Sequence, residues 1–154
     1  MSLESVKKYF KDNNLGYHIY DFKESTATVE LAAQVHGVTP NEIAKTIAFV
    51  QKDKNILLLT VGGARIDNQK YKATFSQKAK MMKLEEVEEI TGHPVGGVCP
   101  FGLKAPMEIY LDVSLDKYEY VYPAAGSTTS SIKITPDELL KITNGIKVDV
   151  CKDY

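Results

Sequence analysis

The sequence contains no tryptophan, and its two cysteines and three histidines are widely scattered. Cys99 and Cys151 stand far apart without a paired spacing, which predicts reduced thiols rather than a disulfide framework. The histidines show neither an HxH nor an HExxH spacing, and no cysteine lies at metal-ligand spacing from them. We therefore expect neither a metal site nor a cofactor.

A long apolar run is also missing. No stretch approaches the roughly 20 apolar residues that a membrane-spanning helix needs, and the first residues lack the basic and then apolar layout of a signal peptide. These absences predict a cytoplasmic protein with no membrane partner. Because the chain shows no repeat, low-complexity stretch or Pro/Gly/Ser-rich linker, we expect its 154 residues to form one domain, residues 1–154.

The net charge of −1 gives the whole chain no general attraction for nucleic acid. Between residues 64 and 83, however, several basic side chains stand against a single acidic one. Such a local excess, with aromatic residues between the charges, suits contacts with RNA phosphates. An ordinary solvated face is the alternative, since four glutamates follow directly. The residues that we predict to contact RNA are Arg65, Lys70, Lys72, Lys78 and Lys80.

The pattern of apolar and turn residues predicts short helices among strands. The runs Thr39-Pro40-Asn41-Glu42 and Thr135-Pro136-Asp137-Glu138 are capping boxes that mark helix starts. Apolar runs on either side of the polar turn 52–55 predict a β-hairpin. Helices are expected at 3–10, 29–35, 67–75, 84–90 and 135–142, and strands at 17–22, 46–50, 56–61, 107–111, 118–122, 131–134 and 146–150. This order indicates an α+β fold with a mixed, largely antiparallel sheet or open barrel flanked by short helices.

Residues 92–102 contain four glycines and two prolines. Glycine lets a ligand approach the main chain, and proline restricts the shapes that the loop adopts. Successive N–H groups in such a loop can donate to one oxygen that develops negative charge, as in an oxyanion hole. A structural turn between the acidic helix and a strand is the alternative interpretation.

Lys45 is flanked by apolar residues, among them Ala44 and Ile47. A partly desolvated ammonium in this position would interact strongly with a carbonyl oxygen or a phosphate. The alternative is a solvated lysine whose stem covers the core.

A second loop of small residues, 124–131, carries hydroxyls that could hydrogen-bond to a substrate amino group or ribose. The alternative is that these hydroxyls bond only within the turn itself. Cys99 lies in the glycine loop, but a lone cysteine without a histidine partner motif is usually inert.

Taken together, these segments resemble the YbaK / prolyl-tRNA-synthetase-associated domain family of aminoacyl-tRNA deacylases. The resemblance spans about residues 17–143. It rests on the order and spacing of Tyr20-Asp21, Ala44-Lys45-Thr46, Thr91-Gly92, Gly96-Gly97-Val98-Cys99-Pro100, Ala125-Gly126 and Thr135-Pro136-Asp137-Glu138-Leu139-Leu140. It implies a trans-editing enzyme without a cofactor. Its expected partners are mischarged tRNA, typically tRNA(Pro) carrying cysteine or alanine, and prolyl-tRNA synthetase.

Carried over by position, the resemblance implies that Lys45 is the essential lysine. It also implies that Gly96, Gly97 and Pro100 form the loop that holds the aminoacyl ester. The implied substrate-binding residues are Tyr20, Cys99, Gly126 and Ser127. Two departures bear on substrate identity: members often have Ser-Ala-Gly-Arg where this chain has Ala124-Ala125-Gly126-Ser127, and serine where it has Cys99.

The predicted mechanism is electrostatic: Lys45 and N–H groups of residues 96–100 stabilise a tetrahedral oxyanion. The attacking group would be a water, a ribose hydroxyl or the thiol of a cysteinyl substrate. A module that binds tRNA or a synthetase without chemistry is the alternative. A cysteine hydrolase that uses Cys99 is a third possibility.

Overall fold

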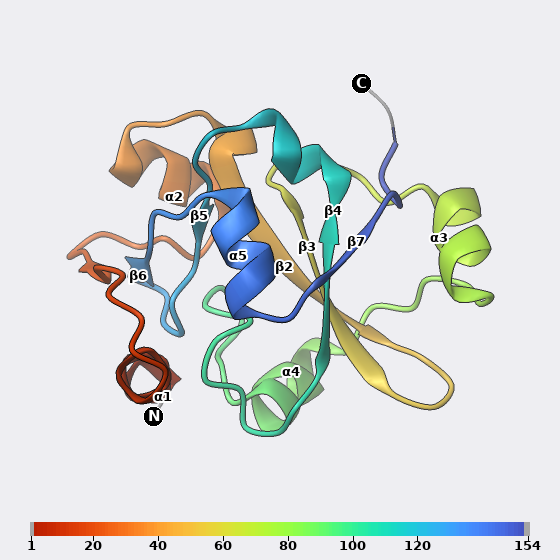
Figure 1. Cartoon of the computed structure of the whole chain (residues 1–154), viewed down its shortest axis with the longest axis horizontal. Coiled ribbons are helices and arrows are strands. Elements are labelled where there is room, and N and C mark those ends of the chain that lie inside the picture. The colour runs from red at the N-terminus through yellow and green to blue at the C-terminus, as the bar shows by residue number, and fades with distance from the viewer. Residues whose placement is uncertain (1, 153–154) are drawn as a thin grey trace.

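The computed structural model describes residues 2–152, in which short helices surround a five-stranded sheet (Figure 1). The predicted helices are present within two residues of their expected bounds. They are α1 (Ser2–Asp12), α2 (Val29–His36), α3 (Asn68–Phe75), α4 (Leu84–Thr91) and α5 (Pro136–Ile142), with the 3₁₀ helices η1 (Pro40–Glu42) and η2 (Val113–Lys117). The helix η2 was not predicted, although Asp112 caps it by accepting from the N–H of Ser114 at 3.0 Å.

Both predicted capping boxes are formed. The N–H of Thr39 donates to the carboxylate of Glu42 at 2.9 Å, and the N–H of Glu138 donates to the hydroxyl of Thr135 at 3.2 Å. Gly37, at φ 71°, ends α2 in the left-handed conformation that glycine adopts without steric cost. These local signals therefore set the helix ends that flank the sheet.

The five-stranded sheet has the order β5-β2-β3-β4-β7. Its strands are β2 (Ile43–Val50), β3 (Asn55–Val61), β4 (Glu108–Asp112), β5 (Tyr122–Pro123) and β7 (Ile146–Val148), and a second sheet pairs β1 (Tyr20–Asp21) with β6 (Ser130–Ser131). The predicted hairpin is confirmed, because β2 and β3 pair antiparallel from Ala44 opposite Val61 to Val50 opposite Asn55.

The α+β class and the mixed sheet are confirmed. The largely antiparallel pairing does not hold for the five-stranded sheet, because β2–β5, β3–β4 and β4–β7 are parallel pairs. Parallel neighbours need a long crossover connection, and here α3 and α4 lie between β3 and β4 while α5 lies between β4 and β7. The edges β5 and β7 stay apart, so no strand among residues 2–152 closes the sheet into a barrel.

Successive residues of β3 point to opposite faces of the sheet, as the pleat requires. Leu57 and Leu59 face a core that contains side chains of α1, α4 and α5, while Ile56 and Leu58 face Tyr71 of α3. Figure 1 shows α5 drawn across this sheet. Within residues 2–152, no helix combines the length and the apolar character that crossing a bilayer requires.

Candidate active site

A cavity of about 340 Å³ lies against β2. Its wall is mostly apolar, and it brings together segments that are far apart in the sequence. The lining residues come from the start of α2 and the segment before it, from β2, from α4 and the segment before it, from the glycine loop and from β5–β6. They are Thr26, Ala27, Thr28, Val29, Ala32, Ile43, Ala44, Lys45, Thr46, Ile47, Ala48, Met81, Met82, Leu84, Val87, Val95, Gly96, Val98, Tyr122, Ala124 and Ser131.

The cavity lies where the outer edge of β2 has no neighbouring strand. The strand β5 covers only Ile43 and Ala44 at one end of this edge. At the other end, the carbonyl of Ala48 accepts from the N–H of Met82 at 2.9 Å. Main-chain groups of alternate residues point to the same side of an antiparallel strand. The N–H and C=O of Thr46 therefore face outward, between these two covered ends.

Two hydroxyls in the cavity wall have no hydrogen-bond partner among the described residues, Thr26 Oγ1 and Thr46 Oγ1. A buried hydroxyl without a partner costs free energy on the order of 1–3 kcal/mol. Both hydroxyls, like the main chain of Thr46, are available to hydrogen-bond to a polar ligand or a water in the cavity.

Lys45 lies inside β2 and lines the cavity. Its Nζ donates to the carbonyl oxygen of Ala64 at 3.2 Å. Burial lowers the pKa of Lys45, while the nearby Cys151 and Glu30 partly oppose this shift. The ammonium is therefore partly desolvated, which agrees with the first of the two interpretations of the sequence.

The glycine loop reaches the cavity through Val95, Val98 and Gly96. Gly96 has φ 89°, and a Cβ in its place would lie 2.9 Å from the Cβ of Ala27. Gly97 has a different environment, because its N–H donates to the carbonyl of Pro94 at 2.9 Å and its carbonyl accepts from the N–H of Gly126 at 3.1 Å. A Cβ on Gly97 would lie 2.7 Å from the main chain of Ser127. Gly97 therefore joins the two small-residue loops.

Cys99 and Pro100 are buried and do not line the cavity. The Cys99 sulfur lies 3.6 Å from His93 Nε2 and 3.6 Å from the carbonyl of Phe101, and burial raises the pKa of its thiol to about 12. A thiol of this kind stays protonated, which disfavours a nucleophilic role. Contrary to expectation, Cys99 does not contact a ligand in the cavity, because its side chain points into the core.

The other expected substrate-binding residues stand behind the cavity wall. Tyr20, Gly126 and Ser127 are absent from the lining residues. The Ser127 hydroxyl pairs with that of Ser130 at 2.6 Å. Tyr20 is opposite Ser131 in the β1–β6 pair, and Ser131 does line the cavity. Tyr20 therefore lies beside a residue of the wall, whereas Gly126 and Ser127 bond to residues that do not line the cavity.

Sequence reasoning missed one polar pair in the wall. Ser131 Oγ lies 2.5 Å from Nε2 of His36, which comes from α2. The two residues are 95 positions apart, so no local motif could have revealed them. Among residues 2–152, no three His, Cys, Asp or Glu side chains gather closely enough to hold a metal ion.

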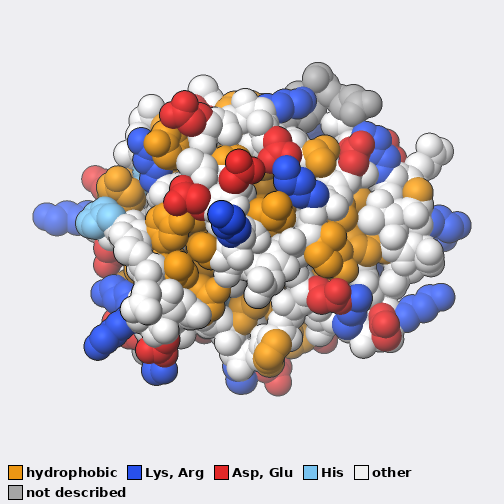
Figure 2. Space-filling view, in the orientation of Figure 1, with side chains coloured by type: hydrophobic (Ala, Val, Ile, Leu, Met, Phe, Trp, Pro, Cys, Tyr) orange, Lys and Arg blue, Asp and Glu red, His pale blue; other side chains and the backbone are white. Residues whose placement is uncertain are grey.

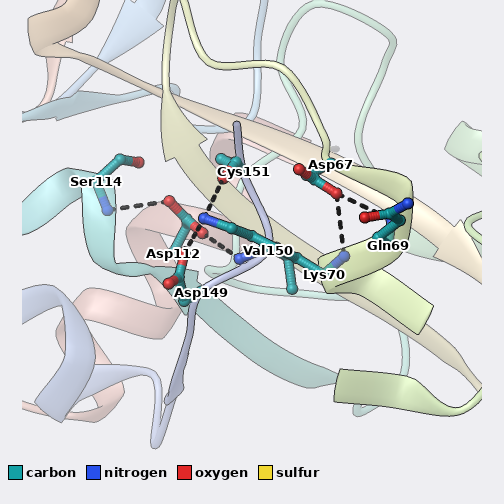
Figure 3. Close-up of polar contacts among 8 residues, drawn as sticks. All are labelled: Asp67, Gln69, Lys70, Asp112, Ser114, Asp149, Val150 and Cys151. Atoms are coloured by element: carbon teal, nitrogen blue, oxygen red, sulfur yellow. Dashed lines mark hydrogen bonds and ion pairs between the residues drawn. The ribbon is translucent and has the colours of Figure 1, made fainter. Parts of the chain in front are cut away.

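One of the basic residues predicted to contact RNA is engaged with another part of the chain. Lys70 donates to the Asp149 carboxylate at 3.1 Å and to the Cys151 carbonyl at 3.0 Å (Figure 3). It thus holds the C-terminal segment. Arg65, Lys72, Lys78 and Lys80 are exposed. Over the face drawn in Figure 2, acidic and basic side chains are interspersed.

The family model for the aminoacyl-tRNA editing domain matches residues 23–142. The chain belongs to this aminoacyl-tRNA editing family. The editing domain is 46% identical to the uncharacterized protein YwhH of Bacillus subtilis over 156 residues, covering 100% of this chain and 99% of YwhH. It is 28% identical to EbsC of Enterococcus faecalis, a candidate Cys-tRNA(Pro)/Cys-tRNA(Cys) deacylase, covering 92% of this chain and 88% of EbsC.

The editing domain also matches a solved structure described as a candidate trans-editing enzyme for prolyl tRNA synthetase. The TM-score is 0.90 at 31% sequence identity, and the match covers 99% of this chain and 98% of that chain. The resemblance inferred from the sequence is therefore confirmed at the level of the family and the fold.

Three large apolar side chains of the editing domain surround the mouth of the cavity. Met81 is 65% exposed, Leu84 66% and Val95 50%. An exposed apolar group at the rim of a cavity is typical of a surface that contacts another molecule. The exposed Lys80 and Lys83 flank Met81 and Met82 in the sequence, so positive charge lies beside this rim.

Proposed function

We propose that this editing domain is an aminoacyl-tRNA deacylase that acts in trans and hydrolyses the ester between tRNA and a wrong amino acid. The observation that carries the proposal is that Lys45, whose ammonium is partly desolvated, and Gly96 line one cavity. The family of the chain and the names of EbsC and the trans-editing structure support the same reaction class.

In the proposed mechanism, the ester carbonyl lies between Lys45 and the glycine loop. The ammonium and the N–H groups of Gly96 and Val98 stabilise the oxyanion that forms in the transition state. Neither N–H donates to a backbone acceptor among residues 2–152. The apolar wall strengthens these interactions, because it lowers the local dielectric constant. Gly97 and Pro100 contribute by fixing the shape of the loop.

An aminoacyl ester is reactive, so positioning and oxyanion stabilisation account for much of the required catalysis. The attacking group is a water, a ribose hydroxyl or, for a cysteinyl substrate, its own thiol. The products are the free amino acid and the tRNA. We propose that this reaction needs no metal and no cofactor.

We propose Cys-tRNA(Pro) and Ala-tRNA(Pro) as substrates. Small side chains form much of the wall, including Ala27, Ala32, Ala44, Ala48 and Ala124, and they leave room for a short aminoacyl group of low polarity. Tyr20, Gly126 and Ser127 do not line the cavity and act indirectly. The name of EbsC supports a cysteinyl substrate.

The proposed partners are mischarged tRNA and prolyl-tRNA synthetase, in the cytoplasm. The exposed Lys78 and Lys80 precede Met81 at the mouth of the cavity, where the phosphates of the tRNA 3′ end would pass. Arg65 and Lys72 would contact the backbone further from the ester. Lys70 is assigned to the C-terminal segment instead, because its ammonium is held there.

Incubation of the protein with a panel of mischarged tRNAs tests the proposal. We expect release of free amino acid from Cys-tRNA(Pro) or Ala-tRNA(Pro) above the uncatalysed rate. The same release is expected after treatment with a thiol-alkylating agent. Binding of tRNA without release would favour the non-catalytic module, and complete inactivation by alkylation would favour a cysteine hydrolase.

A further inference from the structure

Ser131 and His36 form a hydrogen-bonded pair at the cavity. Ser131 is 2% exposed and lines the cavity, and its Oγ lies 2.5 Å from Nε2 of His36. A hydroxyl on a cavity-lining residue that is bonded to an imidazole nitrogen is an arrangement through which a histidine withdraws a proton from a reacting group.

The ring of His36 is fixed by three aromatic side chains. Its centroid lies 5.5 Å from that of Tyr20, 5.0 Å from that of Phe22 and 4.6 Å from that of Tyr122. The rings of Tyr20 and Phe22 are nearly perpendicular to the imidazole, at 86° and 90°. The aromatic contacts therefore hold Nε2 toward Ser131.

This environment keeps the imidazole neutral near pH 7. Burial lowers the pKa of His36 below its ordinary value of 6.5. The titratable side chains packed against the ring are Tyr20 from β1 and Tyr122 from β5. A neutral imidazole has a free lone pair, so it accepts a proton from a hydroxyl.

We propose that Ser131 and His36 form a proton relay that activates the attacking water in the ester hydrolysis proposed above, on which this inference rests. The water oxygen attacks the carbonyl carbon and gives a proton to the Ser131 hydroxyl. That hydroxyl passes its own proton to His36 Nε2, and the carbonyl oxygen takes the negative charge beside Lys45. The bond to the ribose oxygen then breaks, and the imidazolium returns the proton to that oxygen through Ser131.

The geometry favours a relay over attack by Ser131 itself. The residue is held on both sides, opposite Tyr20 in the β1–β6 pair and in a bridge with Ala124. It is also almost fully buried. A water can reach a hydroxyl through a small opening, whereas formation of an acyl-serine requires the substrate carbonyl to approach Oγ to bonding distance. Ser131 is therefore the catalytic residue of the relay, and His36 is its positioning residue.

The test compares Ser131→Ala, Ser131→Thr and His36→Gln in single-turnover and steady-state deacylation of Cys-tRNA(Pro) and Ala-tRNA(Pro) across pH 5 to 8. Positioned acid–base groups contribute about 100-fold or more to a rate, so Ser131→Ala is expected to lose about 100-fold in kcat. Ser131→Thr, which keeps the hydroxyl, is expected to retain most of the rate. Ser114→Ala, at another buried serine whose hydroxyl has no partner among the described residues, is the matched control.

The pH profile separates the relay from a structural role. The wild-type rate, after subtraction of the uncatalysed reaction, is expected to rise with pH through the pKa of His36 and then level off. A glutamine side chain in place of the imidazole would still bond to Ser131 but takes up no proton. His36→Gln is therefore expected to lose this acidic limb while its melting temperature stays close to that of the wild type.

Three results would overturn the relay: unchanged kcat and pH profile in Ser131→Ala and His36→Gln, a raised KM at unchanged kcat, or a trapped acyl-serine detected by mass spectrometry. All three require an active wild-type protein. Absence of wild-type deacylation on the whole tRNA panel would instead contradict the proposed function itself.

Discussion

Replacing Lys45 by methionine removes the positive charge and keeps most of the aliphatic stem, so it separates the ammonium from the packing around it. Lys45 lines an apolar cavity, and its ammonium donates to a neutral carbonyl oxygen at 3.2 Å, so a substrate oxyanion would be a stronger partner. Loss of one oxyanion contact costs about 3–4 kcal/mol. Lys45→Met is therefore expected to slow deacylation by about 10²- to 10³-fold.

The assay is single-turnover release of the amino acid from Cys-tRNA(Pro) and Ala-tRNA(Pro), with Lys45→Ala and Lys45→Arg for comparison. Lys45→Ala should lose as much as Lys45→Met, while Lys45→Arg should retain part of the rate because the charge remains. Thermal melting is expected to show folded proteins. Wild-type rates for Lys45→Met on every aminoacyl-tRNA would refute the assignment.

The pKa of Lys45 supplies a second readout of the same change. Because burial lowers this pKa, the unfolded chain holds the proton more tightly than the folded protein does. The contribution of Lys45 to stability is therefore expected to rise with pH from the folded pKa up to 10.5, while the rate should fall over the same range. Lys45→Met should lose this dependence of stability on pH.

Gly96→Ala is expected to destabilise the fold by about 1–3 kcal/mol and to slow deacylation, because a Cβ at φ 89° would collide with Ala27. Urea unfolding and the tRNA assay measure the two effects, and wild-type values would contradict the assigned geometry. Lys70→Ala is expected to lower the free energy of unfolding by about 1 kcal/mol or less without changing the salt dependence of tRNA binding. Lys80→Ala is expected to reduce that salt dependence by about one phosphate contact. Equal salt slopes for both variants would argue against this distinction. Cys99 is expected to react slowly with iodoacetamide in the native state, because it is fully buried and burial raises its pKa to about 12. Mass spectrometry measures the labelling, and rapid labelling of Cys99 would contradict its burial in the loop.

Local signals in the sequence predicted the helices and the hairpin, because those features depend on neighbouring residues. The two capping boxes each need only four consecutive residues. The directions of β4 and β7 could not be predicted in the same way, since parallel pairing depends on how long connections return across the sheet. The expectation of mostly antiparallel pairing failed for this reason.

The candidate site was predictable in part. A lysine among apolar residues and a loop rich in glycine pointed to Lys45 and Gly96, and the structure brings both to one cavity. Side-chain direction was not predictable: Cys99 turns into the core, and Lys70 turns to the C-terminal segment. The pair of His36 and Ser131 also lay beyond sequence reasoning, because folding joins two residues that no motif connects.

A crystal structure with an amide-linked analogue of 3′-aminoacyl adenosine tests the central claim most directly, because this analogue resists hydrolysis and keeps the carbonyl. We expect its carbonyl oxygen to lie about 3 Å from Lys45 Nζ and within hydrogen-bond distance of the N–H of Gly96 or Val98. An analogue bound with its carbonyl outside this cavity, or with Lys45 still directed only to Ala64, would contradict the account.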